Sequence, residues 1–352
     1  MIQNISLKNF TIFNTLDVQF SPKINIIIGE NGTGKTHLLK AVYSLCAGKG
    51  SLKDTPEVSR EDLERAVTDK LEKTLMPLDA KLGKLHKYGA KENAEIKADF
   101  ISNKSLYLTF RNNSKTVSLK ENQDYQGYTH KPVFIPTKEV LSFMEGFVSL
   151  YNEFKLSFDV TYCDLISQLQ LPLAQESKLS EKSRWAIDQI ENILGGKFIF
   201  HGGGRVTFKS AGNEYSANAV AEGFRKIGVL SRLLETRAIQ PGISGPLLWD
   251  EPEANMHPRM VKYLVEILLE LSRNGQQIIL VTHDYVFLKW FDLLMDKGKE
   301  DHVRFVTLYH GYSSGAVECQ MADDYREIDR NAISAVFSEL YDADIDKSFG
   351  DI

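Results

Sequence analysis

The sequence predicts an α/β fold in which a mixed sheet is flanked by helices and carries inserted helical and β lobes. Short apolar runs typical of buried strands occur at 24–28, 247–249, 277–281 and 303–308. Amphipathic patterns typical of helices lie between or beside them, at 219–236, 258–273 and from 283 to about 295. Because strands alternate with helices here, we expect the strands to form an open, parallel core.

The segment after the first of these strands matches the phosphate-binding pattern G-x-x-x-x-G-K-[ST]. Its glycines allow consecutive backbone N–H groups to face a polyphosphate, and a helix starting near Lys35 adds its positive end. Lys35 is expected to reach the β- and γ-phosphates, and Thr36 to bind Mg²⁺. A purely structural glycine loop is the alternative. The expected nucleotide contacts are Gly29, Glu30, Asn31, Gly32, Thr33, Gly34, Lys35, Thr36 and His37.

Two later strands also end in polar residues. The strand in PLLWDEPE (246–253) delivers Asp250, expected to hold Mg²⁺, and Glu251, expected to orient or deprotonate the attacking water. The strand in IILVTHDY (278–285) delivers His283, a possible donor to the γ-phosphate or to that water. An acidic helix cap and a core histidine are the alternatives. Since ligands bind at the carboxyl ends of parallel strands, we expect these side chains to meet the glycine loop, with Lys35, Glu251 and His283 catalytic.

The rest of the chain predicts smaller units. Residues 2–20 alternate as a β-hairpin that turns at Asn14 and Thr15. A Lys- and Glu-rich stretch, 51–97, contains a helix at 60–75. Further strands are expected at 106–110, 116–119 and 133–135, helices at 140–151, 162–169 and 185–194, and a hairpin at 197–209. We therefore divide the chain into an ATPase core or head (1–50 and 197–352), an inserted lobe (51–132) and a helical lobe (133–196).

Composition limits the classes of function. Lys81, Lys84, Lys87 and Lys91 form either a basic stripe for DNA or RNA or a solvated face. The formal net charge of −5 does not indicate nucleic-acid binding by the surface as a whole. We expect a cytoplasmic protein, because no apolar run reaches membrane-spanning length and the amino end lacks the layout of a signal peptide. The three widely spaced cysteines do not indicate disulfides or a zinc site.

The motifs GENGTGKT, DEPEANMHP and VTHDY, with the opening segment 5–20 and the segment 219–230, resemble ABC-type ATPases of the SMC, RecF and OLD kind. The likeness is greatest to bacterial AAA-type ATPases of phage-defence and toxin–antitoxin-like operons, which segments 134–147 and 331–345 also resemble. The resemblance implies an ABC-ATPase-like core with ATP and Mg²⁺ as cofactors. It also implies a signature loop at Glu222 and Gly223 that completes the nucleotide site of the opposite subunit.

Three positions depart from the pattern of that family. Ala221 stands where Ser is more usual, and His257 stands where many ABC ATPases have an Asp. The Gln expected after the strand at 133–135 is missing, and Thr137, Lys138 or Glu139 takes its place. These departures leave the inter-subunit contacts and the Q-loop residue open.

The resemblance implies two chains that enclose two ATP molecules, as a homodimer or a higher oligomer. The leading hypothesis is an ATPase that controls a separate effector, a nuclease or toxin, in bacterial antiviral defence, because residues 284–352 are too few for a further nuclease domain. A RecF- or SMC-like DNA-repair ATPase is the alternative, although 50–220 has no long heptad arms. A transporter ATPase subunit and a binding module that never hydrolyses ATP are weaker hypotheses.

Overall fold

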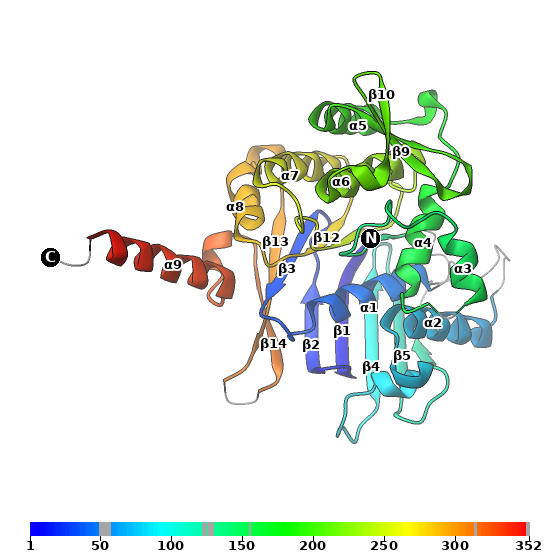
Figure 1. Ribbon diagram of the computed structural model, residues 1–352. Coiled ribbons are helices and arrows are strands. Elements are labelled where there is room, and N and C mark those ends of the chain that lie inside the picture. The colour runs from blue at the N-terminus through cyan, green and yellow to red at the C-terminus, as the bar shows by residue number, and fades with distance from the viewer. Residues whose placement is uncertain (49–57, 122–124, 126–129, 155, 313–314, 350–352) are drawn as a thin grey trace.

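The structure, a computed structural model, describes residues 1–48, 58–121, 125, 130–154, 156–312 and 315–349 (Figure 1). Its centre is a six-stranded sheet in the order β14-β13-β3-β12-β11-β7. Five of these strands are parallel and β14 is antiparallel to β13, so the sheet is mixed as predicted. The strands are β3 Ile24–Gly29, β7 Val133–Ile135, β11 Leu247–Asp250, β12 Ile278–Val281, β13 Val303–His310 and β14 Val317–Ala322.

Side chains that alternate along β3 divide the core between the two faces of this sheet. Ile27 packs in the cluster that contains α1 (Lys35–Ala47). Ile26 and Ile28 pack in the cluster that contains α6 (Glu222–Glu235) and α7 (Pro258–Arg273). Figure 1 shows α6 and α7 on one side of the sheet and α1 on the other. Because the strand is buried on both faces, its side chains are isoleucines except for Asn25, whose buried amide is hydrogen-bonded to the Ser21 backbone.

A second, antiparallel sheet has the order β2-β1-β4-β5-β6. Its strands are β1 Ile2–Phe10, β2 Phe13–Gln19, β4 Ala94–Phe100, β5 Lys104–Phe110 and β6 Ser118–Glu121. The hairpin at 2–20 is confirmed, but the predicted turn at Asn14 and Thr15 is wrong. The strands turn at Thr11 and Ile12, because Phe10 pairs with Phe13 and Thr11 takes a left-handed φ of 51°. Strand β4 was not predicted, and it joins segment 51–132 to the hairpin's sheet.

The predicted helices agree with the structure except in one segment. Helices α2 (Arg60–Leu75), α4 (Val160–Leu169), α5 (Glu181–Leu194) and α8 (Tyr285–Leu294) lie where the apolar spacing placed them. The helix expected at 140–151 is wrong over its first half, since α3 covers only Phe147–Glu153. Gly146 precedes it with a left-handed φ of 69°, and Val140 and Met144 reach the core from non-helical backbone instead. The division into head, inserted lobe and helical lobe stays a proposal.

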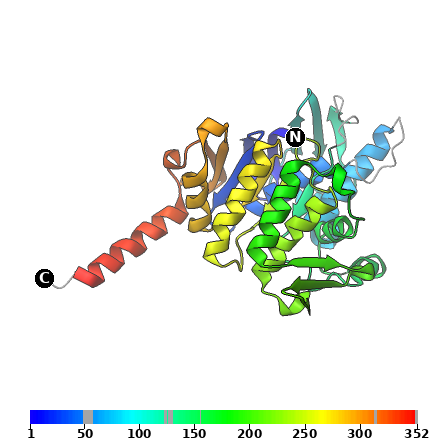
Figure 2. The same ribbon diagram turned by 90° about the horizontal axis from the view of Figure 1, so that it is seen from above.

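The remaining elements lie at the edges of the molecule. Strands β8 (Lys197–Phe200) and β9 (Val206–Ser210) form the predicted hairpin, which β10 (Asn213–Ser216) extends. Helix α9 (Ala332–Phe349) was not predicted, and it projects from the body in both views (Figures 1 and 2). Among the described residues, no helix is both long and apolar enough to cross a membrane.

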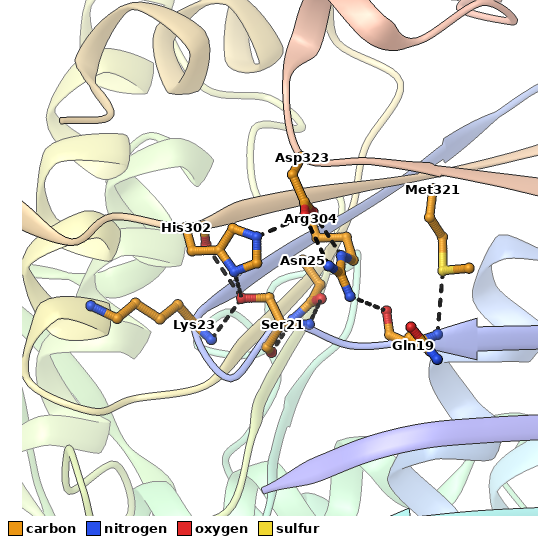
Figure 3. A network of polar contacts seen from close by, with 8 residues as sticks. All are labelled: Gln19, Ser21, Lys23, Asn25, His302, Arg304, Met321 and Asp323. Atoms are coloured by element: carbon orange, nitrogen blue, oxygen red, sulfur yellow. Dashed lines mark hydrogen bonds and ion pairs between the residues drawn. The ribbon is translucent and has the colours of Figure 1, made fainter. Parts of the chain in front are cut away.

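A polar network holds the start of β3, the strand that leads into the glycine loop, against β13 and β14 (Figure 3). The Ser21 hydroxyl lies 2.9 Å from Nδ1 of His302, and the Ser21 amide donates to Asn25 Oδ1 at 2.6 Å. Arg304 donates from Nε and Nη2 to the two carboxylate oxygens of Asp323, at 2.7 and 2.9 Å. The network connects the chain before β3 to the far edge of the sheet.

The Arg304–Asp323 pair makes stability depend on pH. The Arg304 hydrogen bonds lower the pKa of Asp323 to about 2. The pair therefore contributes stability above the ordinary carboxyl pKa, and that stability is lost as pH falls from about 4 to about 2. Because Asp323 is 47% exposed, solvent screening limits the contribution to about 1 kcal/mol at neutral pH. We expect Asp323→Asn to lower the free energy of unfolding by that amount in urea titrations at pH 7.

The same titrations at pH 3 should show a smaller difference between Asp323→Asn and wild type. Asp188→Asn, at an exposed position on α5, is the matched control and should change neither value. A difference between wild type and Asp323→Asn that stays constant from pH 7 to pH 3 would contradict the linkage.

Candidate nucleotide-binding site

The loop between β3 and α1 has the backbone conformation that its glycines allow. Gly29 has a φ of +146°, and Gly34, the residue before α1, has a left-handed φ of 86°. A Cβ atom on Gly34 would lie 2.7 Å from side-chain atoms of Ile12 and Phe13. The hairpin turn of the second sheet therefore packs against this loop. Residues with side chains at these positions would distort both.

Lys35 is buried inside the loop. Its Nζ atom donates to the carbonyl oxygens of Gly29 at 2.7 Å and Glu30 at 2.9 Å. Burial lowers the pKa of Lys35, while the nearby carboxylates of Glu251 and Asp250 act in the opposite direction. The ammonium is thus held against the backbone of the glycine loop. The acidic groups of Glu251 and Asp250 are close enough to favour its charged form.

Thr36 and Asp250 come together from α1 and the end of β11. The Thr36 hydroxyl donates to Asp250 Oδ2 at 3.1 Å. Burial raises the pKa of Asp250, and hydrogen bonds from Thr36 and Thr137 partly offset that rise. A hydroxyl beside a buried carboxylate is a set of hard oxygen donors, which fits Mg²⁺, and a bound cation would favour the ionised carboxylate. Thr137, one of three candidates for the missing Gln, thus contacts this pair.

Glu251 and His283 meet at the same edge of the sheet. The Glu251 amide donates to Val281 O at 2.9 Å, which ties the residue after β11 to the end of β12. Glu251 itself has a left-handed φ of 51°, a strained conformation for a side chain other than glycine. His283 Nδ1 lies 3.4 Å from Glu251 Oε1. The turn therefore directs the glutamate toward the histidine.

Three buried residues behind this pair were missed by sequence reasoning. Lys226 of α6 is 1% exposed, and its Nζ donates to Glu251 O at 3.2 Å. Burial lowers the pKa of Lys226. The Thr282 hydroxyl donates to Glu253 Oε1 at 2.6 Å, and burial raises the pKa of Glu253 to about 7. The positions of Glu253 in DEPE, of Thr282 in VTHDY and of Lys226 after the 221–223 loop were the only signal, since burial depends on packing.

The predicted signature residues lie against the turn that follows β11 in their own chain. Glu222 Oε1 accepts from Asn255 Nδ2 at 2.9 Å. A Cβ on Gly223 would lie 3.0 Å from Asn255 O. Within the described chain, no hydrogen bond joins either residue to the loop at 29–37. The structure thus brings Lys35, Thr36, Asp250, Glu251 and His283 to one edge of the sheet and places Glu222 and Gly223 beside Asn255.

The remaining predicted contacts differ in exposure. Glu30, Asn31 and Gly32 lie on the surface at the tip of the loop, whereas Thr33 is buried and its hydroxyl donates to Glu30 O at 2.8 Å. Burial lowers the pKa of His37. His257 caps α7, because its Nδ1 accepts from the Arg259 amide at 3.2 Å. The residue in the usual Asp position thus has a structural role in this chain.

Comparison with known families agrees with this geometry. A family model described as "AAA domain" matches residues 4–200, which is more than half of the chain. The chain belongs to the AAA domain family. A second model, described as "AAA domain, putative AbiEii toxin, Type IV TA system", matches residues 139–289. This AAA domain therefore carries the P-loop within one matched region and Asp250, Glu251 and His283 within the other.

Curated relatives match the AAA domain over a short stretch only. The DNA replication and repair protein RecF of Halalkalibacterium halodurans is 46% identical over 48 residues, which is 14% of this chain and 13% of the relative. RecF of Bacillus thuringiensis has the same identity over the same length and the same shares of both chains. The chain therefore matches about an eighth of the length of these relatives.

Solved structures match almost the whole chain. The SMC head domain from Thermotoga maritima superposes with a TM-score of 0.51 at 12% identity, covering 91% of this chain and 98% of that one. The Smc head domain of Pyrococcus furiosus, bound to the C-terminal domain of ScpA, superposes with a TM-score of 0.56 at 12% identity, covering 97% and 99%. The fold is that of an SMC-head-like P-loop ATPase. The predicted fold class and the resemblance to SMC and RecF ATPases are confirmed.

Proposed function

We propose that this AAA domain binds Mg²⁺-ATP at residues 29–37 and hydrolyses its β–γ phosphoanhydride bond. The observation that carries the proposal is the convergence of the Thr36–Asp250 pair, 3.1 Å apart, and the Glu251–His283 pair, 3.4 Å apart, at one sheet edge. Thr36 and Asp250 would hold Mg²⁺, which supplies charge neutralisation to the phosphates. Lys35 would bind the β- and γ-phosphates.

Glu251 and His283 would perform the chemistry. Glu251 is partly exposed, with a side chain 27% accessible, so its carboxylate can accept a proton from a water molecule or orient it. His283 lies beside it and would donate a hydrogen bond to the γ-phosphate or to that water. Lys226 and the Thr282–Glu253 pair would keep the turn that carries Glu251 in place.

The AAA domain would bind ATP between two copies of the chain. Glu222 and Gly223 would complete the nucleotide site of the partner, with the start of α6 facing the γ-phosphate. The loop at 221–223 packs on the turn that follows Glu251 in the same copy, and this packing supports the proposal. The contact would connect the catalytic glutamate of one copy to the nucleotide bound by its partner. ATP would then hold a homodimer together and hydrolysis would release it, acting as a switch.

The switch would control a separate effector protein, a nuclease or toxin, in the cytoplasm during bacterial antiviral defence. The match of residues 139–289 to a family described with a toxin and a Type IV TA system supports this role. The 48-residue likeness to RecF favours the alternative, a DNA-repair ATPase. A DNA mobility shift that ATP strengthens and salt weakens would favour repair. Activation of a neighbouring gene's nuclease or toxin would favour defence.

Lys35→Ala tests the nucleotide site. Removing the ammonium deletes charge-assisted hydrogen bonds to phosphate oxygens, so we expect the dissociation constant for ATP to rise at least about 100-fold. Isothermal titration calorimetry with a non-hydrolysable ATP analogue measures this, and phosphate release should fall to background. Lys178→Ala, at an exposed position, is the control and should bind as wild type does. Equal affinity of Lys35→Ala and wild type would reject the assignment of this loop.

A further inference from the structure

Helix α9 presents a face that the body of the molecule leaves uncovered. Its contacts with the body lie near its start, where the Ser334 hydroxyl bonds that of Tyr325 and the Phe337 ring stacks on Tyr285, with ring centroids 4.2 Å apart. Beyond this point the helix extends away from the body in both views (Figures 1 and 2). The rest of α9 is therefore available to another molecule.

The exposed part of α9 has an apolar side. Val336, Leu340 and Tyr341 are 60%, 63% and 67% exposed, and their spacing places them with Phe337 on one side of the helix. Glu339 and Asp342 lie on the opposite side by the same spacing. Helices in proteins gain most of their stability by packing an apolar face against another surface. The apolar side of α9 is thus exposed to solvent.

A second exposed surface on the same chain has the complementary character. Residues 76–91, here called the lysine segment, connect α2 to β4. They expose Met76, Leu78 and Tyr88 at 50%, 70% and 101%. Four lysines accompany these side chains. Lys81, Lys84 and Lys91 are exposed, and Lys87 is partly buried, with its Nζ donating to Ile12 O at 2.7 Å. The segment is therefore both apolar and basic.

The formal net charges of the two surfaces are equal in magnitude and opposite in sign. Helix α9 contains Glu339, Asp342, Asp344 and Asp346 against Lys347, a formal charge of −3. The lysine segment contains four lysines against Asp79, a formal charge of +3. The adjacent Glu92 is already engaged, since Lys8 Nζ lies 2.6 Å from its carboxylate. Opposite charges around apolar side chains favour docking and set its register.

We propose that α9 of one copy of this chain docks on the lysine segment of a second copy. The helix does not reach its own segment in this structure, because it points away from the side where α2 and β4 lie in both views (Figures 1 and 2). An anionic membrane or a nucleic acid would repel the acidic helix. A second copy offers both the charge and the apolar side chains that α9 needs.

This contact joins two different surfaces, so it either closes into a reciprocal dimer or continues from copy to copy. It involves none of residues 29–37, 222–223, 250–251 or 283. It therefore stands independently of ATP binding, and it would connect ATP-bound pairs into larger assemblies.

Sedimentation velocity of nucleotide-free Lys35→Ala protein tests the proposal, because that variant removes any ATP-dependent assembly. At low salt we expect the average mass to exceed that of one chain and to increase as the protein concentration increases. At 0.5 M salt the association constant should fall at least about tenfold, because salt screens the attraction between the acidic helix and the lysines. A monomer at every concentration and salt would overturn the proposal.

Charge reversals identify the surfaces. In the Lys35→Ala background, Glu339→Lys with Asp342→Lys should weaken association at least about tenfold. Lys84→Glu with Lys91→Glu should do the same. When the two doubly reversed proteins are mixed, one carries an intact lysine segment and the other an intact α9, so a 1:1 complex should form. Each protein alone should associate at least about tenfold more weakly than the mixture.

The matched control reverses two exposed lysines elsewhere, Lys178→Glu with Lys209→Glu, and should associate like its parent. All the charge reversals change exposed residues, and thermal melts check that each protein remains as folded as its Lys35→Ala parent. Association that the reversals leave unchanged, or a mixture that stays monomeric, would show that α9 and the lysine segment do not bind each other.

Discussion

Glu251→Gln is expected to slow ATP turnover at least about 100-fold while leaving ATP affinity within about twofold of wild type. Glutamine has nearly the shape of glutamate, but its amide accepts no proton from water, and general-base catalysis contributes about 10² to 10⁴ in rate. ATP contacts come from residues 29–37, which the substitution leaves intact. Single-turnover phosphate release measures the chemical step, and calorimetry with ATP measures binding.

The same variant should accumulate as an ATP-bound dimer. If hydrolysis releases the two copies, then blocking it leaves ATP in place as the link between them. Sedimentation with and without ATP measures the mass. To separate this effect from docking by α9, the Glu251→Gln change is made together with Glu339→Lys and Asp342→Lys. If ATP binds to this protein and its mass stays that of one chain, the two-copy site is wrong.

Glu153→Gln provides the control for Glu251→Gln, because it makes the same chemical change at an exposed position on α3. Its turnover should equal that of wild type. If Glu251→Gln also turns over ATP at the wild-type rate, Glu251 is not the catalytic base, and the site would be a binding site alone.

Local patterns predicted the parts of this molecule that depend on near neighbours. The strand β3 is mostly isoleucine because both of its faces are buried, and the glycine loop follows it directly. A parallel arrangement then requires the ends of β11 and β12 to lie near the loop. For these reasons Thr36, Asp250, Glu251 and His283 were placed together from the sequence.

Features that depend on distant packing were not predictable. Lys226 follows the 221–223 loop as an ordinary helical lysine, yet the fold buries it against the turn of Glu251. Strand β4 is a different case, because its sequence AEIKADF alternates strictly between apolar and polar residues and was nevertheless missed; it pairs with β1, about ninety residues earlier, and with its neighbour β5. The helix expected from Val140 does not form before Gly146. Its apolar residues Val140 and Met144 reach the core from non-helical backbone instead. For Lys226 and for the segment before Gly146, contacts made by the whole fold decided the outcome.

Gly29→Ala is expected to destabilise the protein far more than Gly32→Ala, although both glycines belong to the same loop. A Cβ at Gly29 would lie 2.1 Å from the carbonyl oxygen of Leu308, and φ there is +146°. The two residues are register partners on β3 and β13, so neither backbone can move without parting the strands. We expect a loss of about 3 kcal/mol or more in the free energy of unfolding.

The Gly32→Ala variant separates the cost of a steric clash from the cost of an unfavourable backbone conformation. A Cβ there would meet nothing within 4 Å, and φ is +83°. Only the strain of a left-handed alanine applies, about 1 to 2 kcal/mol. Urea denaturation of both variants measures the difference, and an equal loss would show that β3 and β13 separate easily. A larger loss at Gly29 would show that the loop's first glycine is required by the sheet itself, before any phosphate binds.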